Sequence, residues 1–115
     1  MAGPDSEYRL LNVRRLVNRV KTSLIEDTSW AVFEASDERL WTALRRDVAR
    51  YLGALWRQGA LAGKTEAEAF YVRCDAETNP KTEREAGRVH VWIGLAVVKP
   101  AEFVVFSIAQ ATSGP

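Results

Sequence analysis

The sequence contains one cysteine, Cys74, and one histidine, His90, among its 115 residues. A single cysteine excludes an intramolecular disulfide framework and any multi-cysteine zinc site. Cys74 stands beside Asp75 with no Lys or His nearby in the sequence, so we expect an inert thiol. His90 lies in an alternating apolar segment without a placed base or nucleophile, which favours a packed or surface histidine over a catalytic one. We therefore expect no metal site.

Long apolar runs and nucleotide-binding or hydrolase motifs are also lacking. The longest uncharged apolar run, residues 89–98, is interrupted by His90 and is far shorter than the about 20 residues of a membrane-spanning helix. No secretory signal, glycine-rich dinucleotide loop, Walker loop, HExxH or GxSxG motif is visible. We expect a non-enzymatic, cytoplasmic domain without a cofactor or a membrane partner.

Length and composition predict one domain. The chain is 47% hydrophobic and 27% charged, with a net charge of +1, which is ordinary for a globular protein and excludes wholesale disorder. A chain of 115 residues leaves little room for a second core. We expect a flexible tail over residues 1–6, a single domain over residues 7–112 and a short tail over residues 113–115.

Two stretches have the apolar spacing of an amphipathic helix. The first extends from about Glu7 to Glu26, and the second begins after a cap at Ser36 or Asp37 and ends near Gly59. The apolar stripe of the second helix comprises Leu40, Trp41, Leu44, Val48, Tyr51, Leu52, Leu55 and Trp56. Such a stripe must be buried, since each large apolar side chain contributes about 1.5–3 kcal/mol on burial.

Apolar, β-branched runs predict the strands at residues 30–34, 70–74, 89–97 and 103–109. Alternation is clearest in the third run, where the valine, isoleucine and leucine residues at odd positions point one way. Thr65–Glu68 and Thr82–Glu85 match the capping box and predict short helical turns, while Asn79-Pro80 is a breaker. We expect an α+β fold, with two amphipathic helices packed on one face of a small, mainly antiparallel β-sheet.

A row of arginines lies opposite the apolar stripe of the second helix. On a helical wheel Arg39, Arg46, Arg50 and Arg57, which we call the arginine ridge, fall within about 40° and extend over about 27 Å. Arg45 adds a charge to one side. Aligned like charges repel, so a face that only solubilises a helix usually mixes signs. The ridge favours docking on an acidic surface, because guanidinium pairs bidentately with carboxylates or phosphates.

Several interpretations of these residues stay open. The ridge is either a solvated face balanced by nearby acids, a nucleic-acid-binding surface, or a docking site for an acidic protein. The net charge of +1 argues against nucleic acid, because a phosphate-reading domain of this size is normally strongly basic. A small enzyme would have to use Glu34, Asp37 or Asp75 as its acid or base, and the sequence predicts no pocket that raises the pKa of one of them.

Six blocks in order resemble the C-terminal domain of contractile phage tail sheath proteins, which also occurs in the sheaths of R-type pyocins and related contractile injection systems. The match runs from about Tyr8 to Gln110. The blocks are Asn12–Leu16, Trp30–Glu34, Ser36-Asp37-Glu38 before Leu40-Trp41, Leu55–Gly63, Val72–Asp75 and Pro100–Val104.

The resemblance implies a structural role in virion or particle assembly, as part of a phage tail or tail-like particle. Sheath subunits stack as hexameric rings on an inner tube, and the matching tube-facing stretch, about Arg45 to Ala54, includes Arg46 and Arg50. The expected partners are therefore a tube protein with an acidic outer surface and other sheath subunits. Strand addition between neighbouring subunits, as in the family, would use Phe103, Val104, Val105, Phe106, Ser107 and Ile108.

Overall fold

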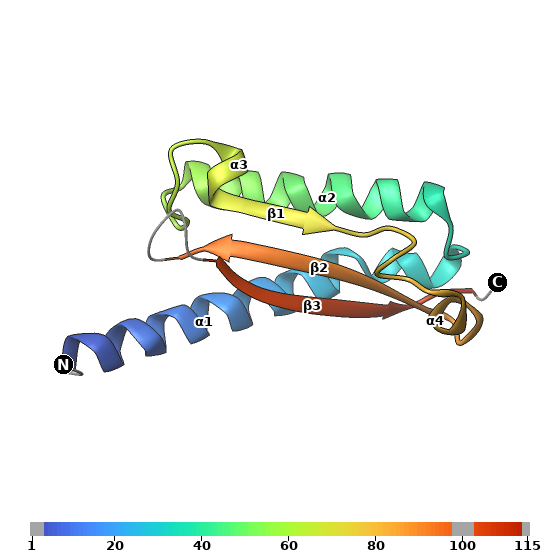
Figure 1. Cartoon of the computed structure of the whole chain (residues 1–115), viewed down its shortest axis with the longest axis horizontal. Coiled ribbons are helices and arrows are strands. Elements are labelled where there is room, and N and C mark those ends of the chain that lie inside the picture. The colour runs from blue at the N-terminus through green and yellow to red at the C-terminus, as the bar shows by residue number, and fades with distance from the viewer. Residues whose placement is uncertain (1–3, 98–102, 114–115) are drawn as a thin grey trace.

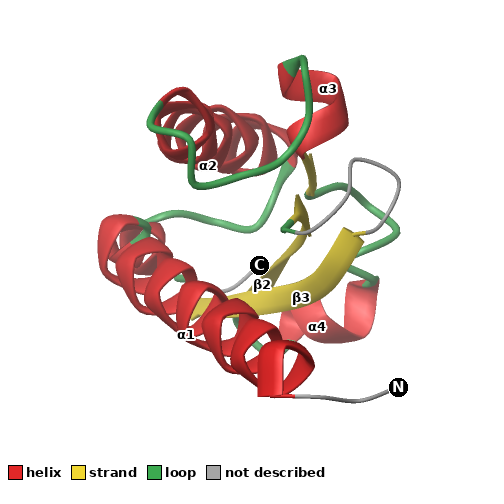
Figure 2. Ribbon diagram, turned by 90° about the vertical axis from the view of Figure 1, so that its left-hand side faces the viewer, coloured by secondary structure: helices red, strands yellow, loops and turns green. Residues whose placement is uncertain are grey.

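The chain folds into two long helices on one face of a three-stranded antiparallel sheet (Figures 1 and 2). The computed structural model describes residues 4–97 and 103–113. This arrangement confirms the expected α+β fold. The elements are α1 (Pro4–Asp27), the 3-10 helix η1 (Ser29–Phe33), α2 (Glu38–Arg57), α3 (Glu66–Ala69), β1 (Phe70–Arg73), α4 (Lys81–Glu85), β2 (Arg88–Ala96) and β3 (Phe103–Ala111).

The sheet has the order β1-β2-β3, with β2 in the centre. The predicted alternation along β2 is confirmed, because Val89, Val91, Ile93 and Leu95 are buried beneath the helices. Trp92 points to the opposite face and is 42% exposed. One face of the sheet therefore belongs to the core, and the other carries partly exposed side chains.

Helix α2 has the limits that its sequence predicts. The side chain of Asp37 accepts a hydrogen bond from the backbone N–H of Leu40, which caps the first turn. Gly59 adopts a φ of 85°, a left-handed conformation in which any other residue would carry a Cβ penalty. Between these signals the predicted stripe is buried at Leu40, Trp41, Leu44, Val48, Leu52 and Leu55.

Helix α1 begins at Pro4, three residues before its expected start, so residues 4–6 lie in the helix. Between Leu11 and Asp27, its first fully buried side chains are Val20 and Leu24, in the second half of the helix. The first half extends past the end of the sheet, toward the N-terminus on the left of Figure 1. The expected domain limits at residues 7 and 112 remain a prediction.

The strand expected at residues 30–34 is wrong, because these residues form most of η1. Local hydrogen bonds from Ala31 to Thr28 and from Glu34 to Ala31 satisfy the backbone without a neighbouring strand. Ala31 is fully buried while Val32 and Phe33 are exposed, so the apolar composition of this run does not reflect a buried strand. Composition and the short length of the run could not separate these two cases.

The two predicted capping boxes have different outcomes. Thr65 accepts from the N–H of Glu68 as expected, but the Glu68 carboxylate accepts from the N–H of Lys64 rather than from Thr65. The second box is wrong, since α4 begins directly after Pro80 and includes Thr82 in its first turn. Pro80 is the N-cap residue, with an extended backbone, and its carbonyl oxygen accepts from the N–H groups of Glu83 and Arg84, so the helix begins at Lys81 rather than after Thr82.

Asn79 is fully buried and connects the loop after β1 to the central strand. Its Oδ1 accepts from the N–H of His90 at 2.6 Å, and its Nδ2 donates to the carbonyl oxygens of His90 at 3.2 Å and Asp75 at 3.0 Å. The sequence predicted only a chain break here, because the partner on β2 is eleven residues away. One side chain therefore satisfies backbone groups of two segments.

Replacing Asn79 with Ala should lower the free energy of unfolding by about 2–4 kcal/mol. The substitution removes the acceptor of the His90 N–H and one donor each from the carbonyl oxygens of His90 and Asp75, which keep the hydroxyl of Thr78 as a partner. An unpaired N–H in this part-buried site carries a desolvation cost. Urea unfolding followed by circular dichroism measures the change. The control is Asn18→Ala on the exposed face of α1, which should change stability by less than about 0.5 kcal/mol. Equal effects of the two substitutions would contradict the role given to Asn79.

Glu83 of α4 joins this short helix to β2 through an exposed ionic cluster. Its carboxylate accepts from Nε and Nη2 of Arg88 at 3.2 and 2.9 Å, and its Oε1 lies 2.7 Å from Nε2 of His90. These hydrogen bonds, first that of Arg88 and then that of His90, lower the pKa of Glu83 from 4.5 to about 2. Because the pKa is lowered by folding, the ionised carboxylate stabilises the fold above pH 4.5, and this contribution disappears as the pH falls toward 2.

The substitution Glu83→Gln should therefore reduce stability at pH 6 but have a shrinking effect in acid. The urea midpoint of the variant should lie below that of the wild type at pH 6, and the gap should close between pH 4.5 and 2. A matched control is Glu26→Gln at an exposed position of α1, which should lower the urea midpoint at pH 6 by less than Glu83→Gln does. A Glu83→Gln gap that stays constant down to pH 2 would rule out the ionic contribution.

Candidate functional site

The arginine ridge forms an exposed row along the side of α2 that faces away from the sheet. Arg39, Arg46, Arg50 and Arg57 are all exposed, while the buried stripe of the same helix faces the core. This orientation follows from packing, because burying the apolar stripe of a helix turns the opposite face outward. The structure thus brings together the four residues that the helical wheel had grouped.

Carboxylates of the same chain neutralise the ridge only in part. Nη1 of Arg57 lies 3.4 Å from Oε1 of Glu66 in α3, and Nε of Arg46 lies 3.9 Å from Oδ1 of its neighbour Asp47. Arg39 and Arg50 make no ion pair with any residue that the structure describes. The ridge therefore has charge available at its start and centre and less at its C-terminal end.

Arg45 is turned away from the ridge toward the end of β1. Its Nη1 donates to the carbonyl oxygen of Cys74, while its Nη2 donates to Oγ1 of Thr42 at 3.1 Å and lies 3.8 Å from Oε1 of Glu38. The guanidinium thus ties α2 to the residue that follows β1. No sequence pattern predicts this contact, since Arg45 and Cys74 are 29 residues apart.

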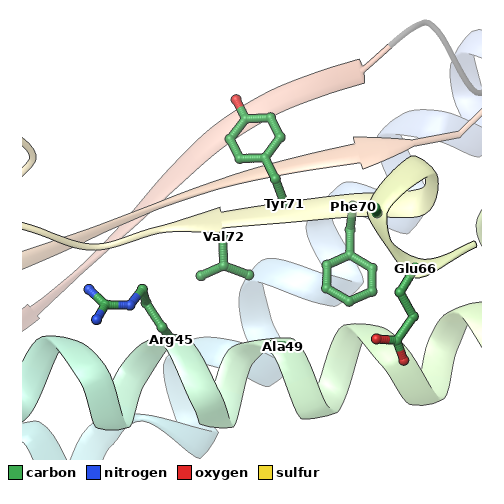
Figure 3. Close-up of a pocket in the computed structure, with 7 residues that line it drawn as sticks. Arg45, Ala49, Glu66, Phe70, Tyr71 and Val72 are labelled. Carbon is green, nitrogen blue, oxygen red and sulfur yellow. The ribbon is translucent and has the colours of Figure 1, made fainter.

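A shallow groove of about 330 Å³ runs between α2 and β1 (Figure 3). Arg45 and Glu66 lie toward its two ends, with Val72 and Phe70 between them, whereas the ring of Tyr71 points to the other face of the sheet. The residues that line the groove do not include a nucleophilic side chain paired with a general base. The groove therefore offers shape and charge but no arrangement for covalent chemistry.

The candidate acids and the thiol are occupied or unsuited to catalysis. Cys74 is fully buried, and this burial raises the pKa of its thiol to about 12, so it stays protonated at neutral pH. Asp75 accepts hydrogen bonds from the N–H of Thr78 and from Arg73, which lower its pKa rather than raise it. Asp37 caps α2, and Glu34 lies exposed after η1. These environments give no support to the enzyme interpretation.

No cluster of three potential metal ligands occurs within residues 4–97 and 103–113. In the same residues, no helix combines the length and apolar character needed to cross a bilayer.

Strand β3 lies at one edge of the sheet, where it pairs with β2. No strand that the structure describes covers its other side. Among the six predicted pairing residues, Phe106 and Ile108 face the core, Phe103 and Val105 are exposed on the open face, and Val104 and Ser107 are partly buried. Because α2 packs on β1 and α1 packs on β3, the ridge and this edge lie on different sides of the domain.

The chain matches the family described as phage tail sheath C-terminal domain over residues 4–111. A chain in a cryo-EM structure of the anti-feeding prophage (AFP) baseplate is 34% identical with a TM-score of 0.70, covering 82% of this chain and 26% of that one. A chain in a cryo-EM structure of an extracellular contractile injection system, the PVC sheath complex in the contracted state, is 38% identical with a TM-score of 0.68, covering 82% and 27%. A comparison with curated protein sequences gives no match.

These relatives agree with the resemblance carried by the six sequence blocks. The chain spans about a quarter of the length of each relative, so it corresponds to one part of a longer subunit there. The family match includes every helix and strand of the structure, from the start of α1 at Pro4 to the end of β3 at Ala111. The chain belongs to the phage tail sheath C-terminal domain family.

Proposed function

We propose that this domain attaches a contractile sheath to its inner tube through the arginine ridge. A structural role follows from the family, and the docking surface is the additional step. The observation that carries it is the row of exposed arginines in which Arg39 and Arg50 have no carboxylate partner in the described residues. The expected partner is a tube protein whose outer surface displays Asp and Glu side chains, since a guanidinium pairs bidentately with a carboxylate.

Arg46 belongs to the same docking surface, and Arg57 and Arg45 have lesser parts in it. The nearest acid to Arg46 is its neighbour Asp47 at 3.9 Å, a long contact that a tube carboxylate can replace. Arg57 already pairs with Glu66, and Arg45 holds the end of β1, so both would have to exchange an existing interaction. The central ridge residues are therefore the primary contacts.

The energetics suit a metastable attachment. Exposed ion pairs contribute only about 0–1 kcal/mol each, so one subunit would bind the tube weakly. Repetition of the same contacts around many rings gives a large total that is lost together when the subunits move. Such an interface holds the extended sheath and releases it during contraction.

Neighbouring sheath subunits would join through the free edge of β3. Backbone N–H and C=O groups on an edge strand can pair with an added strand, and the exposed Phe103 and Val105 can pack against its side chains. The ridge and the β3 edge lie on different sides of the domain, so both contacts can form at once. Assembly would take place in the cytoplasm, before the finished phage tail or tail-like particle acts.

The double substitution Arg46→Glu with Arg50→Glu should leave the fold intact and abolish co-assembly with the tube. Both side chains are exposed and lie opposite the core, so the circular dichroism spectrum and urea midpoint should change little. Reversal of two charges converts attraction to the acidic tube into repulsion. Electron microscopy of full-length subunits expressed with their tube protein measures the outcome as the fraction of extended sheaths.

The matched control is Lys64→Glu with Lys81→Glu, which makes the same change in net charge at exposed positions outside the ridge. This control should assemble normally. Extended sheaths at wild-type frequency in the ridge variant would refute the proposed tube contact.

A further inference from the structure

A small pocket of about 270 Å³ lies where α4 meets the segment between η1 and α2, toward the right-hand end of Figure 1. Its lining comprises Ser36, Lys81, Arg84 and Glu85. The volume lies below the about 300–1,000 Å³ of clefts that hold drug-sized ligands, so the pocket has room for a small chemical group rather than a nucleotide. None of these four residues belongs to the arginine ridge or to the β3 edge.

Arg84 is a cation of this pocket that has no partner among the residues that the structure describes. Its Nε is inaccessible to solvent and makes no hydrogen bond, and its guanidinium forms no ion pair there. Both sequence neighbours of Arg84 are acids that pair elsewhere. Glu83 is held by the side chains of β2, and Oε1 of Glu85 lies 3.7 Å from Nζ of Lys81. A buried N–H without an acceptor carries a desolvation cost, which an acceptor from outside the chain would relieve.

Ser36 offers the pocket a hydroxyl whose hydrogen is unused. The residue is 8% exposed, and its Oγ accepts from Nε1 of Trp41 at 3.1 Å. This bond orients the oxygen, while no described residue accepts a hydrogen bond from the hydroxyl. Asp37 caps α2, so Ser36 is not needed for the cap that the sequence allowed to either residue. The hydroxyl therefore remains a donor for a group in the pocket.

The two walls of the pocket are connected through the residues that follow β3. The N–H of Thr112 donates to the carbonyl oxygen of Gly87, just after α4, at 2.9 Å. The N–H of the next residue, Ser113, donates to the carbonyl oxygen of Glu34, before α2, at 2.9 Å. Two consecutive residues thus fix the spacing of the two segments, and such preorganisation lowers the entropy cost of binding.

The charges of the pocket favour one carboxylate. Lys81 and Arg84 are cations and Glu85 is an anion, so the lining has one positive charge in excess. A carboxylate carries one negative charge and two oxygens that fit the planar fork of a guanidinium. A phosphate group carries nearly two negative charges and would meet stronger repulsion from Glu85.

We propose that this pocket binds a carboxylate group, supplied by a small free acid or by an Asp or Glu side chain of another protein. Arg84 turns so that its Nε–H and one Nη–H pair with the two oxygens, and Ser36 donates its hydroxyl hydrogen to one of them. The movement breaks no interaction of Arg84 with the described residues, because its side chain has none there. Lys81 adds attraction from the rim of the pocket.

Titration of the isotope-labelled chain with sodium acetate, at an ionic strength held constant with sodium chloride, tests the site by NMR. The signals of the Arg84 Nε–H and of the Ser36 amide should shift and saturate, with a dissociation constant of about 1–30 mM for a ligand with so few atoms. Inorganic phosphate at the same ionic strength should bind about threefold more weakly or less. A glutamate blocked at both ends, whose only charge is its side-chain carboxylate, distinguishes the two sources. Binding of both carboxylates supports a protein side chain as the ligand, and binding of acetate alone supports a small free acid.

Arg84→Gln should weaken acetate binding about tenfold or more, followed at the Ser36 amide, because the charge and the planar fork are lost. The urea midpoint of this variant should not fall, since Arg84 has no partner to lose in the described residues. Arg50→Gln makes the same change at an exposed arginine of the ridge and is the matched control, which should bind acetate like the wild type. Glu85→Gln removes the acid from the lining and should tighten binding about threefold.

Three outcomes would overturn the proposal. They are shifts that rise without saturation and equally at the exposed arginines, phosphate binding that is tighter than acetate binding, and an Arg84→Gln variant that binds acetate like the wild type. The titration contains no tube protein, so these outcomes do not bear on the proposed attachment of the sheath. Normal tube assembly of the ridge variant would likewise leave the pocket standing.

Discussion

Burial of the apolar stripe of α2 against the sheet is the constraint on which the rest of the structure depends. The stripe, from Leu40 to Leu55, packs over strands β1 and β2 and fixes the rotation of the helix about its axis. Only that rotation places the arginine ridge in solvent. The same packing covers one face of the sheet, so the other face and the β3 edge remain available for partners.

The sequence predicted the elements in which several signals agree. Helix α2 has a cap at Asp37, a long periodic stripe and a left-handed glycine at Gly59, and all three lie where they were expected. Strand β2 alternates between buried and less buried residues from Arg88 to Ile93, as its sequence predicts, and its last four residues, Ile93 to Ala96, are all buried. In both cases local preference and tertiary packing favour the same conformation, which is the condition for reliable prediction.

Contacts between distant segments could not be predicted in this way. The run at residues 30–34 has the composition of a strand, yet local hydrogen bonds fold most of it into a 3-10 turn, and its one printed backbone bond to a distant segment joins Ser113 to Glu34. The helical wheel placed Arg45 beside the ridge, but its guanidinium donates to the carbonyl oxygen of Cys74. The wheel placed Arg57 on the ridge, but its guanidinium pairs with the carboxylate of Glu66. Each of these partners comes from another element, so a helical wheel contains no information about it. The sequence therefore predicted that the ridge is exposed, but not which of its arginines pair with carboxylates of the same chain.

The distribution of charge explains how a chain with a net charge of only +1 can present strongly basic surfaces. Acids gather between Thr22 and Glu38, and bases gather between Arg9 and Lys21 and on the ridge. Segregated charges of this kind cancel in the total but not locally, since screening in physiological salt limits their reach to about 8 Å. Each surface therefore acts on its own partner. Separate weak interfaces of this kind would suit the proposed attachment, in which one subunit binds a tube and its neighbours at the same time and later releases some of these contacts.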